Sequence, residues 1–250
     1  MTRTFLATTA LTLGLSLPAL ALDLSAMSDA EKQAFGAQVR AYLIENPEVI
    51  MEAVRVLEDR QQAAAIEDDL KLLEDNAEAI FQNANDWAGG NPEGDITLVE
   101  FIDYRCGYCR KAHDEVNELV KSDGNIRFVV KEFPILGEES LISSQFAIAV
   151  RMVAGDEAYK RAHDALITLR GDATAESMAA LAGELGLDAA AISAKMSSPE
   201  VAAVIEANHA LGTTMQINGT PSFIIDRTMV RGYVPLDGMR QIVEGQRQDG

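Results

Sequence analysis

Positive charge is scarce in this sequence: 21 Lys and Arg residues stand against 39 Asp and Glu residues, and the formal net charge is -18. A chain this acidic is a poor candidate for binding nucleic acid or an anionic membrane surface, because both ligands are themselves negative. Long apolar runs are missing as well, and a membrane-spanning helix needs about 20 consecutive apolar residues. We therefore expect no nucleic-acid partner and no membrane span in the mature chain.

An apolar stretch at the N-terminus is shorter than a membrane span. It occupies residues 5–17, follows the positive Arg3, and precedes the sequence ALA at positions 19–21, which has the A-x-A form of a cleavage site. These features predict that residues 1–21 are a secretory signal peptide cleaved after Ala21, with a packed N-terminal helix as the alternative. We expect the mature protein to be exported to the periplasm.

Cysteine is almost absent: the two cysteines in 250 residues are Cys106 and Cys109. Two cysteines do not make a disulfide scaffold, and a chain of this length buries a hydrophobic core without one. A zinc site built on the pair would have to recruit two of His113, His163 and His209, which are scattered along the sequence. We therefore expect no metal site and no cofactor, and the cysteine pair predicts a different chemistry.

Two helices are predicted before the cysteines. The sequence SDAE at positions 28–31 is a capping box that starts the first helix, and Asn46-Pro47 ends it and starts the second. The second predicted helix carries an apolar stripe in two parts that are out of phase. The first part consists of Ile50, Val54, Leu57, Gln61 and Ala64, and the second of Ile66, Leu70, Leu73, Ala77 and Ile80.

A helix as long as this stripe extends on the order of 55 Å, which exceeds the width of a small domain. Such a stripe needs a cover, and a symmetric copy of the chain supplies one. The alternative is a helix pair packed on the domain that follows. We predict that residues 22–87 are a helical oligomerisation region that forms a dimer or a trimer.

The Gly- and Pro-rich sequence AGGNPEGD at positions 88–95 predicts the boundary to a second domain, residues 88–250. The predicted elements of this domain are strands at 96–103 and 126–131, a helix at 110–121, helices over about 141–211, strands at 222–226 and 229–233, and a helix at 236–244. Their order is β-α-β, a helical insertion, and β-β-α, which indicates an α/β fold.

A strand that leads directly into C-x-x-C and a helix places Cys106 at a helix N-terminus. Unpaired backbone N–H groups and the helix dipole stabilise a thiolate there, and basic residues at positions 105, 110, 111 and 113 add positive charge nearby. Cys106 is therefore the expected nucleophile. Cys109, one turn inside the helix, is expected to attack the mixed disulfide and release the substrate.

The segments LVEFIDYRCGYCRKAH, VVKEFPILGEES and INGTPSFIIDRTMVRGYVP resemble the thioredoxin-fold DsbA family of exported thiol–disulfide oxidoreductases. The segment YLIENPEVIMEAVRVLE resembles the N-terminal helical region of its suppressor-of-copper-sensitivity C subgroup. The resemblance implies a thioredoxin fold interrupted by a helical insertion at about residues 138–213 and preceded by an N-terminal helical arm. It also implies a redox-active disulfide between Cys106 and Cys109.

The resemblance assigns roles to four further positions. Thr220-Pro221 matches the cis-proline loop of the family, which lies opposite the cysteines and binds substrate backbone. Glu100 matches a buried acid on the strand that enters the motif, and Lys131 matches its partner on the next strand. Such a pair would relay protons to Cys109, and a plain salt bridge is the alternative.

The residues between the cysteines bear on the type of reaction. Gly107-Tyr108 is the pair found in DsbC-type disulfide isomerases, and it is expected to contact substrate. Tyr108 stands where strongly oxidising members of the family have a His, so the couple is expected to be less oxidising. The resemblance thus implies a disulfide isomerase and reductase that acts on misoxidised exported proteins and is kept reduced by a DsbD-like or ScsB-like membrane thiol electron donor.

Two other functions stay open at this point. A DsbA-like dithiol oxidase would use the same two cysteines but would be found mostly oxidised in the cell. A copper-sequestering protein would bind Cu(I) through reduced thiols, because soft thiolate ligands favour that ion. The methionines are dispersed rather than clustered, however, and are more simply apolar residues that fill gaps in the core.

Overall fold

The structure, a computed structural model, describes residues 27–249, and the predicted signal peptide lies outside the described residues. The internal contacts of the chain divide it into two compact units, with the division between Gln61 and Gln62. Within residues 27–249, every helix is either too short or too polar to cross a bilayer.

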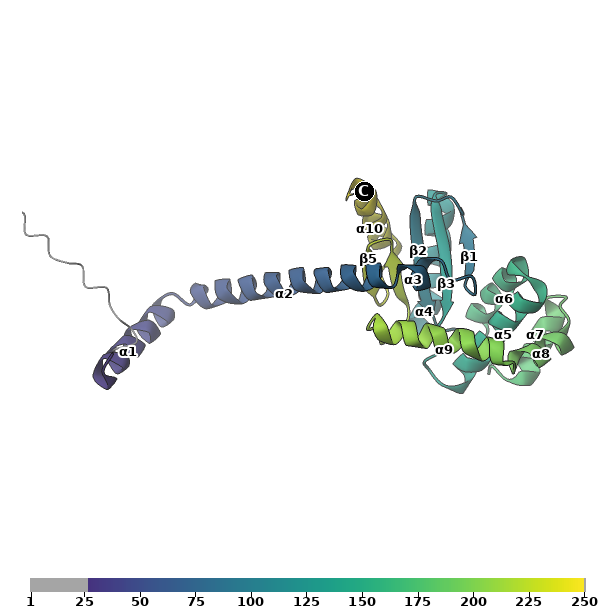
Figure 1. Ribbon diagram of the computed structural model, residues 1–250, viewed down its shortest axis with the longest axis horizontal. Coiled ribbons are helices and arrows are strands. Elements are labelled where there is room, and N and C mark those ends of the chain that lie inside the picture. The colour runs from purple at the N-terminus through teal and green to yellow at the C-terminus, as the bar shows by residue number, and fades with distance from the viewer. Residues whose placement is uncertain (1–26, 250) are drawn as a thin grey trace, which may run out of the picture. The chain divides into compact units, whose positions relative to one another are not determined.

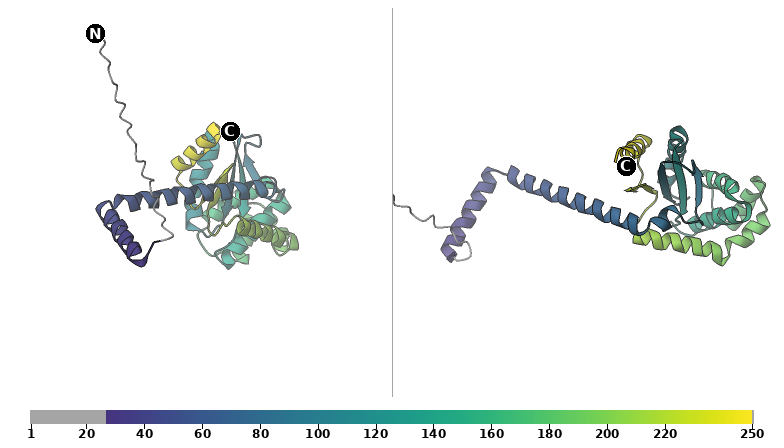
Figure 2. Two further views of the ribbon diagram at one scale, coloured as in Figure 1. Left: turned by 60° about the vertical axis from the view of Figure 1, so that its left-hand side comes forward. Right: turned by 45° about the horizontal axis from the view of Figure 1, so that its top comes forward.

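The N-terminal unit contains α1 (Asp29–Glu45) and the first half of α2 (Glu48–Asp75). The predicted capping box is present, because the Ser28 side chain accepts a hydrogen bond from the backbone N–H of Glu31 while the Glu31 carboxylate accepts one from the backbone N–H of Ser28. Figures 1 and 2 show α2 as one uninterrupted helix. No residue of α1 is buried in the described part of the chain.

The second unit is built on a five-stranded sheet with the strand order β1-β3-β2-β4-β5. The strands are β1 (Trp87–Gly90), β2 (Ile96–Ile102), β3 (Ile126–Glu132), β4 (Ser222–Ile225) and β5 (Thr228–Arg231). Strands β2 and β3 are parallel, and the pairs β1–β3, β2–β4 and β4–β5 are antiparallel. The connection between the parallel strands is α4 (Gly107–Asp123), as a β-α-β unit requires.

Helices occupy the remainder of the second unit. The first is α3 (Ala77–Phe81), which precedes the sheet. The predicted insertion consists of α5 (Glu138–Ala154), α6 (Asp156–Thr168), α7 (Ala175–Glu184), α8 (Ala189–Met196) and α9 (Pro199–Thr214), and α10 (Leu236–Asp249) follows the last strand. Figure 1 shows the helices of the insertion gathered beside the sheet. The predicted order of strands and helices is therefore present, with β1 and α3 as additions.

Two apolar layers cover the sheet, one on each face. Because successive side chains of a strand point to opposite faces, Leu98 and Phe128 pack with α4, α10 and the insertion, whereas Val99 and Val129 pack in a second cluster. The second cluster also contains Leu73, Ile80, Phe101, Phe133, Leu211, Met215, Ile217 and Ile224. The cysteines belong to the first layer, so the chemistry lies on the α4 face of the sheet.

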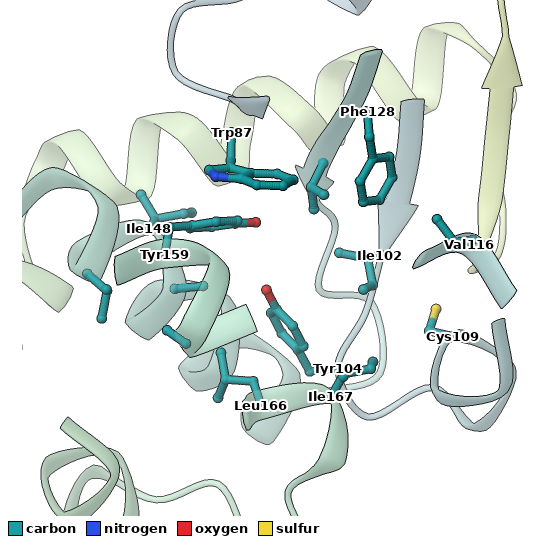
Figure 3. Packing of buried hydrophobic residues seen from close by; sticks show 14 of the residues in the cluster. Trp87, Ile102, Tyr104, Cys109, Val116, Phe128, Ile148, Tyr159, Leu166 and Ile167 are labelled. Carbon is teal, nitrogen blue, oxygen red and sulfur yellow. The ribbon is translucent and has the colours of Figure 1, made fainter. Parts of the chain in front are cut away.

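The predicted boundary at residues 88–95 differs from the structure, in which the second unit begins earlier. Trp87 and β1 belong to the sheet: the Trp87 indole N–H donates to the Asp156 carbonyl at 3.0 Å, and its ring stacks on Tyr159 with 5.6 Å between the centroids (Figure 3). Ile80 is completely buried as well. Glycine and proline residues here form an edge strand and a turn rather than a linker between domains.

The two parts of the predicted stripe on α2 have different environments. Ile50, Val54 and Leu57, in the first part, are 40–55% exposed. In the second part, Leu73 and Ile80 are buried against the sheet. The alternative of packing on the domain that follows therefore holds for Leu73 on α2 and for Ile80 on α3, whereas Ile66, also in the second part, is 51% exposed.

Candidate functional site

Cys106 is the N-cap residue of α4, and the turn before it is held by Asp103. The backbone N–H of Cys106 donates to the Asp103 carbonyl at 3.0 Å. The Asp103 carboxylate accepts from the backbone N–H of Arg105 at 2.8 Å, and from those of Ile135 and Leu136 at 2.8 and 3.0 Å. One buried acid, which the sequence did not single out, thus joins the cysteine turn to the loop after β3.

The Cys106 thiol is strongly acidified. Its pKa is lowered to about 5, first by a hydrogen bond from the Cys109 thiol and further by the backbone N–H groups of Cys109 and Tyr108, which outweigh the opposite effect of burial. These donors are the free N–H groups of a helix N-terminus, as predicted. Cys106 keeps 8% of its surface exposed, so it is shielded but reachable.

The predicted basic residues near the cysteines are not what lowers the Cys106 pKa, because each is held elsewhere. Arg105 forms an ion pair with Glu139 at 2.9 Å, and the Arg110 guanidinium donates to the Tyr104 carbonyl at 3.1 Å. The Lys111 ammonium lies over the Tyr233 ring, 4.3 Å from its centroid. The thiolate is therefore stabilised by local hydrogen bonds rather than by side-chain cations.

Cys109 has the opposite environment. It has no exposed surface, and the hydrogen bond to Cys106 together with burial and the nearby Glu100 carboxylate raises its pKa well above the ordinary thiol value. Its sulfur lies in the apolar layer near Ile102 and Val116 (Figure 3). Cys109 is therefore a protonated thiol as long as Cys106 is free.

Glu100 lies on β2 on the same face as α4 and is almost completely buried. Burial, followed by the charges of Cys106 and Glu132, raises its pKa to about 8. One of its carboxylate oxygens, Oε1, has no hydrogen-bond partner among the described residues. A buried carboxyl with this pKa exchanges its proton near neutral pH, which is the property of a general acid or base.

Lys131 does not pair with Glu100, and the predicted Glu100–Lys131 pair is wrong. In the parallel register of β2 and β3, Lys131 is opposite Phe101 and Glu100 is opposite Val130, so the two side chains point to opposite faces. The Lys131 ammonium instead forms a buried ion pair with Asp86 and donates to the Ala79 carbonyl at 2.7 Å. Lys131 thus holds the segment before β1 on the sheet.

Glu132 is the residue that shares a face with Glu100. It accepts hydrogen bonds from the hydroxyls of Tyr104 and Tyr159 at 2.7 and 2.6 Å, and burial raises its pKa to about 7. The Tyr104 hydroxyl is also 3.1 Å from Nδ1 of His163. The sequence held a signal for Glu132: Lys131 and Glu132 are adjacent in a buried strand, so their side chains must point to opposite faces of the sheet.

The predicted cis-proline loop lies against Cys106. The Thr220-Pro221 peptide bond is cis, and Cys106 Sγ lies 3.1 Å from the Thr220 carbonyl oxygen, which accepts a hydrogen bond from the thiol when Cys106 is protonated. The Pro221 carbonyl, which directly precedes β4, accepts a hydrogen bond from the backbone N–H of Gly232 at 3.0 Å. The structure therefore brings Cys106, Cys109, Thr220 and Pro221 together.

The surface around Cys106 is apolar and accessible. A side chain added at Gly107 would meet no atom within 4 Å, and Tyr108 is 62% exposed while it stacks on Tyr233. Ile135 and Leu136, in the loop held by Asp103, are also exposed. The sequence reasoning missed these two residues, although an apolar pair in a loop between a strand and a helix was a usable signal.

Two family profiles and several solved structures match this chain. The sequence profile of a family described as "Thioredoxin" matches residues 82–245, and that of the "Copper resistance protein ScsC N-terminal domain" matches residues 31–64. The structure of a thioredoxin-like oxidoreductase from Silicibacter pomeroyi DSS-3 is similar, with 39% sequence identity and a TM-score of 0.64 over 68% of this chain and 97% of that chain.

Two structures with lower identity share the fold. One is ScsC of Proteus mirabilis in a transitional conformation, with 23% identity and a TM-score of 0.65 over 90% of this chain and 99% of that chain. The other is the thiol-disulfide exchange protein alpha-DsbA2 of Wolbachia pipientis, with 23% identity and a TM-score of 0.68 over 73% of this chain and 98% of that chain.

Curated relatives include a sodium/proton antiporter, NhaA 1, of Salinispora arenicola, which is 26% identical over 159 residues. These residues are 63% of this chain and 24% of the antiporter, so the chain spans about a quarter of the length of the curated relatives it matches. The likeness therefore concerns one part of that protein.

Proposed function

Because this chain belongs to the thioredoxin family, we propose that it is a thiol–disulfide oxidoreductase that acts as a disulfide isomerase and reductase on exported proteins. The observation that carries the proposal is the asymmetry of the two thiols: the Cys106 pKa is lowered to about 5, while Cys109 is buried and keeps its proton. The Cys106 sulfur is thus the nucleophile that attacks first, and the Cys109 thiol reacts only in a later step.

The reaction begins at Cys106. Its thiolate attacks one sulfur of a client disulfide, forms a Cys106–client mixed disulfide, and releases the second client sulfur as a thiolate that takes a proton from solvent. In isomerisation, another thiolate of the same client attacks the mixed disulfide and returns Cys106 as a thiolate. No net electrons are transferred in that case, and the client keeps its number of disulfides.

Reduction uses Cys109 for the second step. The Glu100 carboxylate takes the Cys109 proton, and the new thiolate attacks the Cys106 sulfur, which forms the Cys106–Cys109 disulfide and releases the reduced client. Burial and a pKa of about 8 suit Glu100 to this transfer. The disulfide then needs two electrons, which we assign to a DsbD-like or ScsB-like membrane thiol donor.

The client is expected to bind across the cis-proline loop. Thr220 and Pro221 offer backbone next to Cys106, and exposed Tyr108 with Ile135 and Leu136 offers apolar contact. An unfolded segment around a wrong disulfide presents both extended backbone and apolar side chains, whereas a correctly folded client buries them. This surface therefore favours misoxidised clients.

The proposed self-association of the arm favours isomerisation over simple oxidation. Phe35, Val39 and Tyr42 on α1 and Ile50, Val54, Met51 and Leu57 on α2 are at least 40% exposed in the chain by itself. A second or third copy that covers them would hold several active sites around one client at high effective concentration. We assign the exposed apolar side chains of α1 and of the first part of the stripe to this contact. We assign the periplasm to the mature protein on the strength of the predicted signal peptide.

Capture of clients in cells tests the proposal. The variant Cys109→Ala should accumulate mixed disulfides between Cys106 and exported proteins, because the resolving thiol is missing, and Cys106→Ala should accumulate none. In cells with the wild-type protein, acid quenching followed by thiol alkylation should find the two cysteines mostly reduced. A mostly oxidised pair would favour the dithiol oxidase, and absence of mixed disulfides with Cys109→Ala would contradict both functions.

A further inference from the structure

Two histidines that are far apart in the sequence meet between α4 and α6. His113 lies two turns after Cys106 on α4, and His163 is adjacent to Asp164 on α6. The two imidazole rings are 5.3 Å apart, His113 Nε2 is 3.2 Å from Asp164 Oδ1, and one possible ligand atom from each of the three residues lies within 4.8 Å of the others. The scattered histidines of the sequence are therefore partly gathered by the fold.

The hydrogen bonds around His163 determine which of its nitrogens is available. The Tyr104 hydroxyl has one proton, and it donates this proton to Glu132 at 2.7 Å. The 3.1 Å contact between that hydroxyl and His163 Nδ1 is then a hydrogen bond from the Nδ1 proton to the Tyr104 oxygen. Nε2 of His163 therefore carries a lone pair, and its ring is oriented by a buried Tyr–Glu pair. Metal-binding histidines are commonly oriented in this way.

The cluster is accessible as well as ordered. The side chain of His163 is buried, that of His113 is 10% exposed, and that of Asp164 is 43% exposed, so an ion can enter from the Asp164 side. Two imidazole nitrogens and one carboxylate oxygen are the donor set of a borderline divalent ion, at about 2.0–2.2 Å from each ligand. Three protein ligands leave a fourth position for water.

A cation already neutralises Asp164 in the structure. The Lys160 ammonium lies 2.6 and 2.7 Å from the two oxygens of this carboxylate, one turn away on α6. The Lys160 side chain is 33% exposed, so its flexible stem can turn to solvent when another cation arrives. Lys160 is thus a competitor whose removal should strengthen metal binding.

We propose that His113, His163 and Asp164 form a binding site for a borderline divalent transition-metal ion such as Zn²⁺, which joins the helix of the cysteine pair to the helical insertion. The site does not require either cysteine and does not depend on the proposed isomerase activity. Bound metal stabilises the folded protein, because the fold brings His113 next to His163 and Asp164, which are far from it in the sequence.

Titration of the oxidised protein with Zn²⁺ tests the site, because a Cys106–Cys109 disulfide removes the thiolates as competing ligands. At a free Zn²⁺ concentration 100-fold above Kd, the midpoint of thermal unfolding should rise by about 5 °C. His113→Gln and Asp164→Asn should each weaken Zn²⁺ binding at least ~10-fold, as measured by calorimetry. His209→Gln is the matched control, because His209 lies apart from the cluster on α9 and packs against Phe133.

The partly exposed ligands carry this test, because substitution of buried His163 alone could unfold the protein. Lys160→Gln should tighten Zn²⁺ binding several-fold, a gain that a purely structural ion pair between Lys160 and Asp164 does not predict. The inference is overturned if oxidised wild-type protein shows no Zn²⁺-dependent shift. It is also overturned if the shift survives in a His113→Gln/Asp164→Asn double variant, which would mean that Zn²⁺ binds elsewhere on the acidic surface.

Discussion

Cys106 and Cys109 are one helical turn apart and have opposite affinities for a proton. Cys106 caps α4 and receives hydrogen bonds from the Cys109 thiol and from backbone N–H groups, whereas Cys109 is enclosed in the apolar layer near Glu100. At neutral pH the pair therefore holds one thiolate and one thiol. This division of roles follows from position in the helix and does not require a nearby cation.

Alkylation of the reduced protein as a function of pH measures this asymmetry. Cys106 should react with a midpoint near pH 5, and Cys109 at least ~100-fold more slowly at pH 7, with fragment-ion mass spectrometry to assign each site. Because the folded-state pKa of Cys106 is lowered, its thiolate stabilises the reduced protein above the pKa of an unfolded cysteine, and this stabilisation is lost as pH falls through about 5. Equal reactivity of the two thiols would contradict the assignment of roles.

Glu100→Gln should slow the release of client from the mixed disulfide about 10-fold, because no carboxylate then takes the Cys109 proton. It should also change how stability depends on pH. The folded-state pKa of about 8 lies above the ordinary 4.5, so the protonated carboxyl contributes stability fully below pH 4.5, and the contribution is lost as pH rises through about 8. Denaturant unfolding at pH 5 and pH 8 should therefore differ less in the variant.

The matched control for this substitution is Glu118→Gln, which removes an exposed acid from the surface of α4. Stopped-flow measurement of single turnovers with a peptide mixed disulfide follows the release step. An unchanged release rate in Glu100→Gln would assign proton removal to another group, with Glu132 as the next candidate.

Residue roles could be read from the sequence only where they depend on local position. Cys106 at a helix N-terminus follows from a strand that leads into C-x-x-C. The partner of Lys131 does not, because it depends on the register between β2 and β3 and on which face each side chain takes. The pairing of His113 with His163 likewise depends on how α6 packs on α4.

At the scale of elements, α2 shows how one helix serves two purposes. Its first stripe remains exposed, and its second stripe packs on the sheet through Leu73, with an ion pair between Asp69 and Arg231 of β5 at 2.7 Å. The phase change between the two parts of the stripe was visible in the sequence. It separates the exposed first part from the part that contains Leu73, which packs on the sheet. Which part packs on the sheet was not visible, because apolar periodicity indicates a helix face that needs a partner without identifying that partner.

The segment before the sheet is held by one buried ion pair, and its removal should be costly. Lys131→Met leaves Asp86 without its partner in a buried position, so the free energy of unfolding should fall by about 3–5 kcal/mol. A double variant, Asp86→Leu/Lys131→Met, should recover much of this loss, since neither charge remains. Chemical denaturation measures both, and Lys121→Met, an exposed lysine on α4, is the control.

The rate of the thiol chemistry should be nearly unaffected by Lys131→Met in the fraction that is folded, because Lys131 lies on the face opposite Cys109 and Glu100. If the variant kept its stability but released clients slowly, the result would support the predicted proton relay through Lys131. It would contradict the assignment of Lys131 to the buried ion pair with Asp86 alone.

At the scale of the whole molecule, the sequence predicted the α/β thioredoxin fold with its helical insertion and N-terminal arm, and this fold is confirmed. The order of strands and helices is recorded in local periodicity and in the turn residues between them. The limit of the catalytic unit was misplaced because β1 is short and rich in glycine, and its role as an edge strand depends on pairing with β3. Self-association remains a prediction.

The proposed isomerase depends on the exposed stripe of the arm, which joins several active sites. Val54→Glu/Leu57→Glu in the full chain places charge in that stripe without change to the catalytic unit, and should give a monomer by light scattering. The control is Gln62→Glu/Ala63→Glu, which adds the same charge at exposed positions outside the stripe and should leave the oligomer intact.

Isomerisation of scrambled ribonuclease, compared with reduction of insulin, distinguishes joined active sites from single ones. Reduction needs one Cys106 and one cis-proline loop, so both double variants should reduce insulin at the wild-type rate. Isomerisation gains from neighbouring active sites around the same client, so the stripe variant should lose at least ~10-fold of that activity while the control keeps it. A wild-type protein that is already monomeric, or a monomeric stripe variant with full isomerase activity, would contradict the proposed role of the arm in isomerisation.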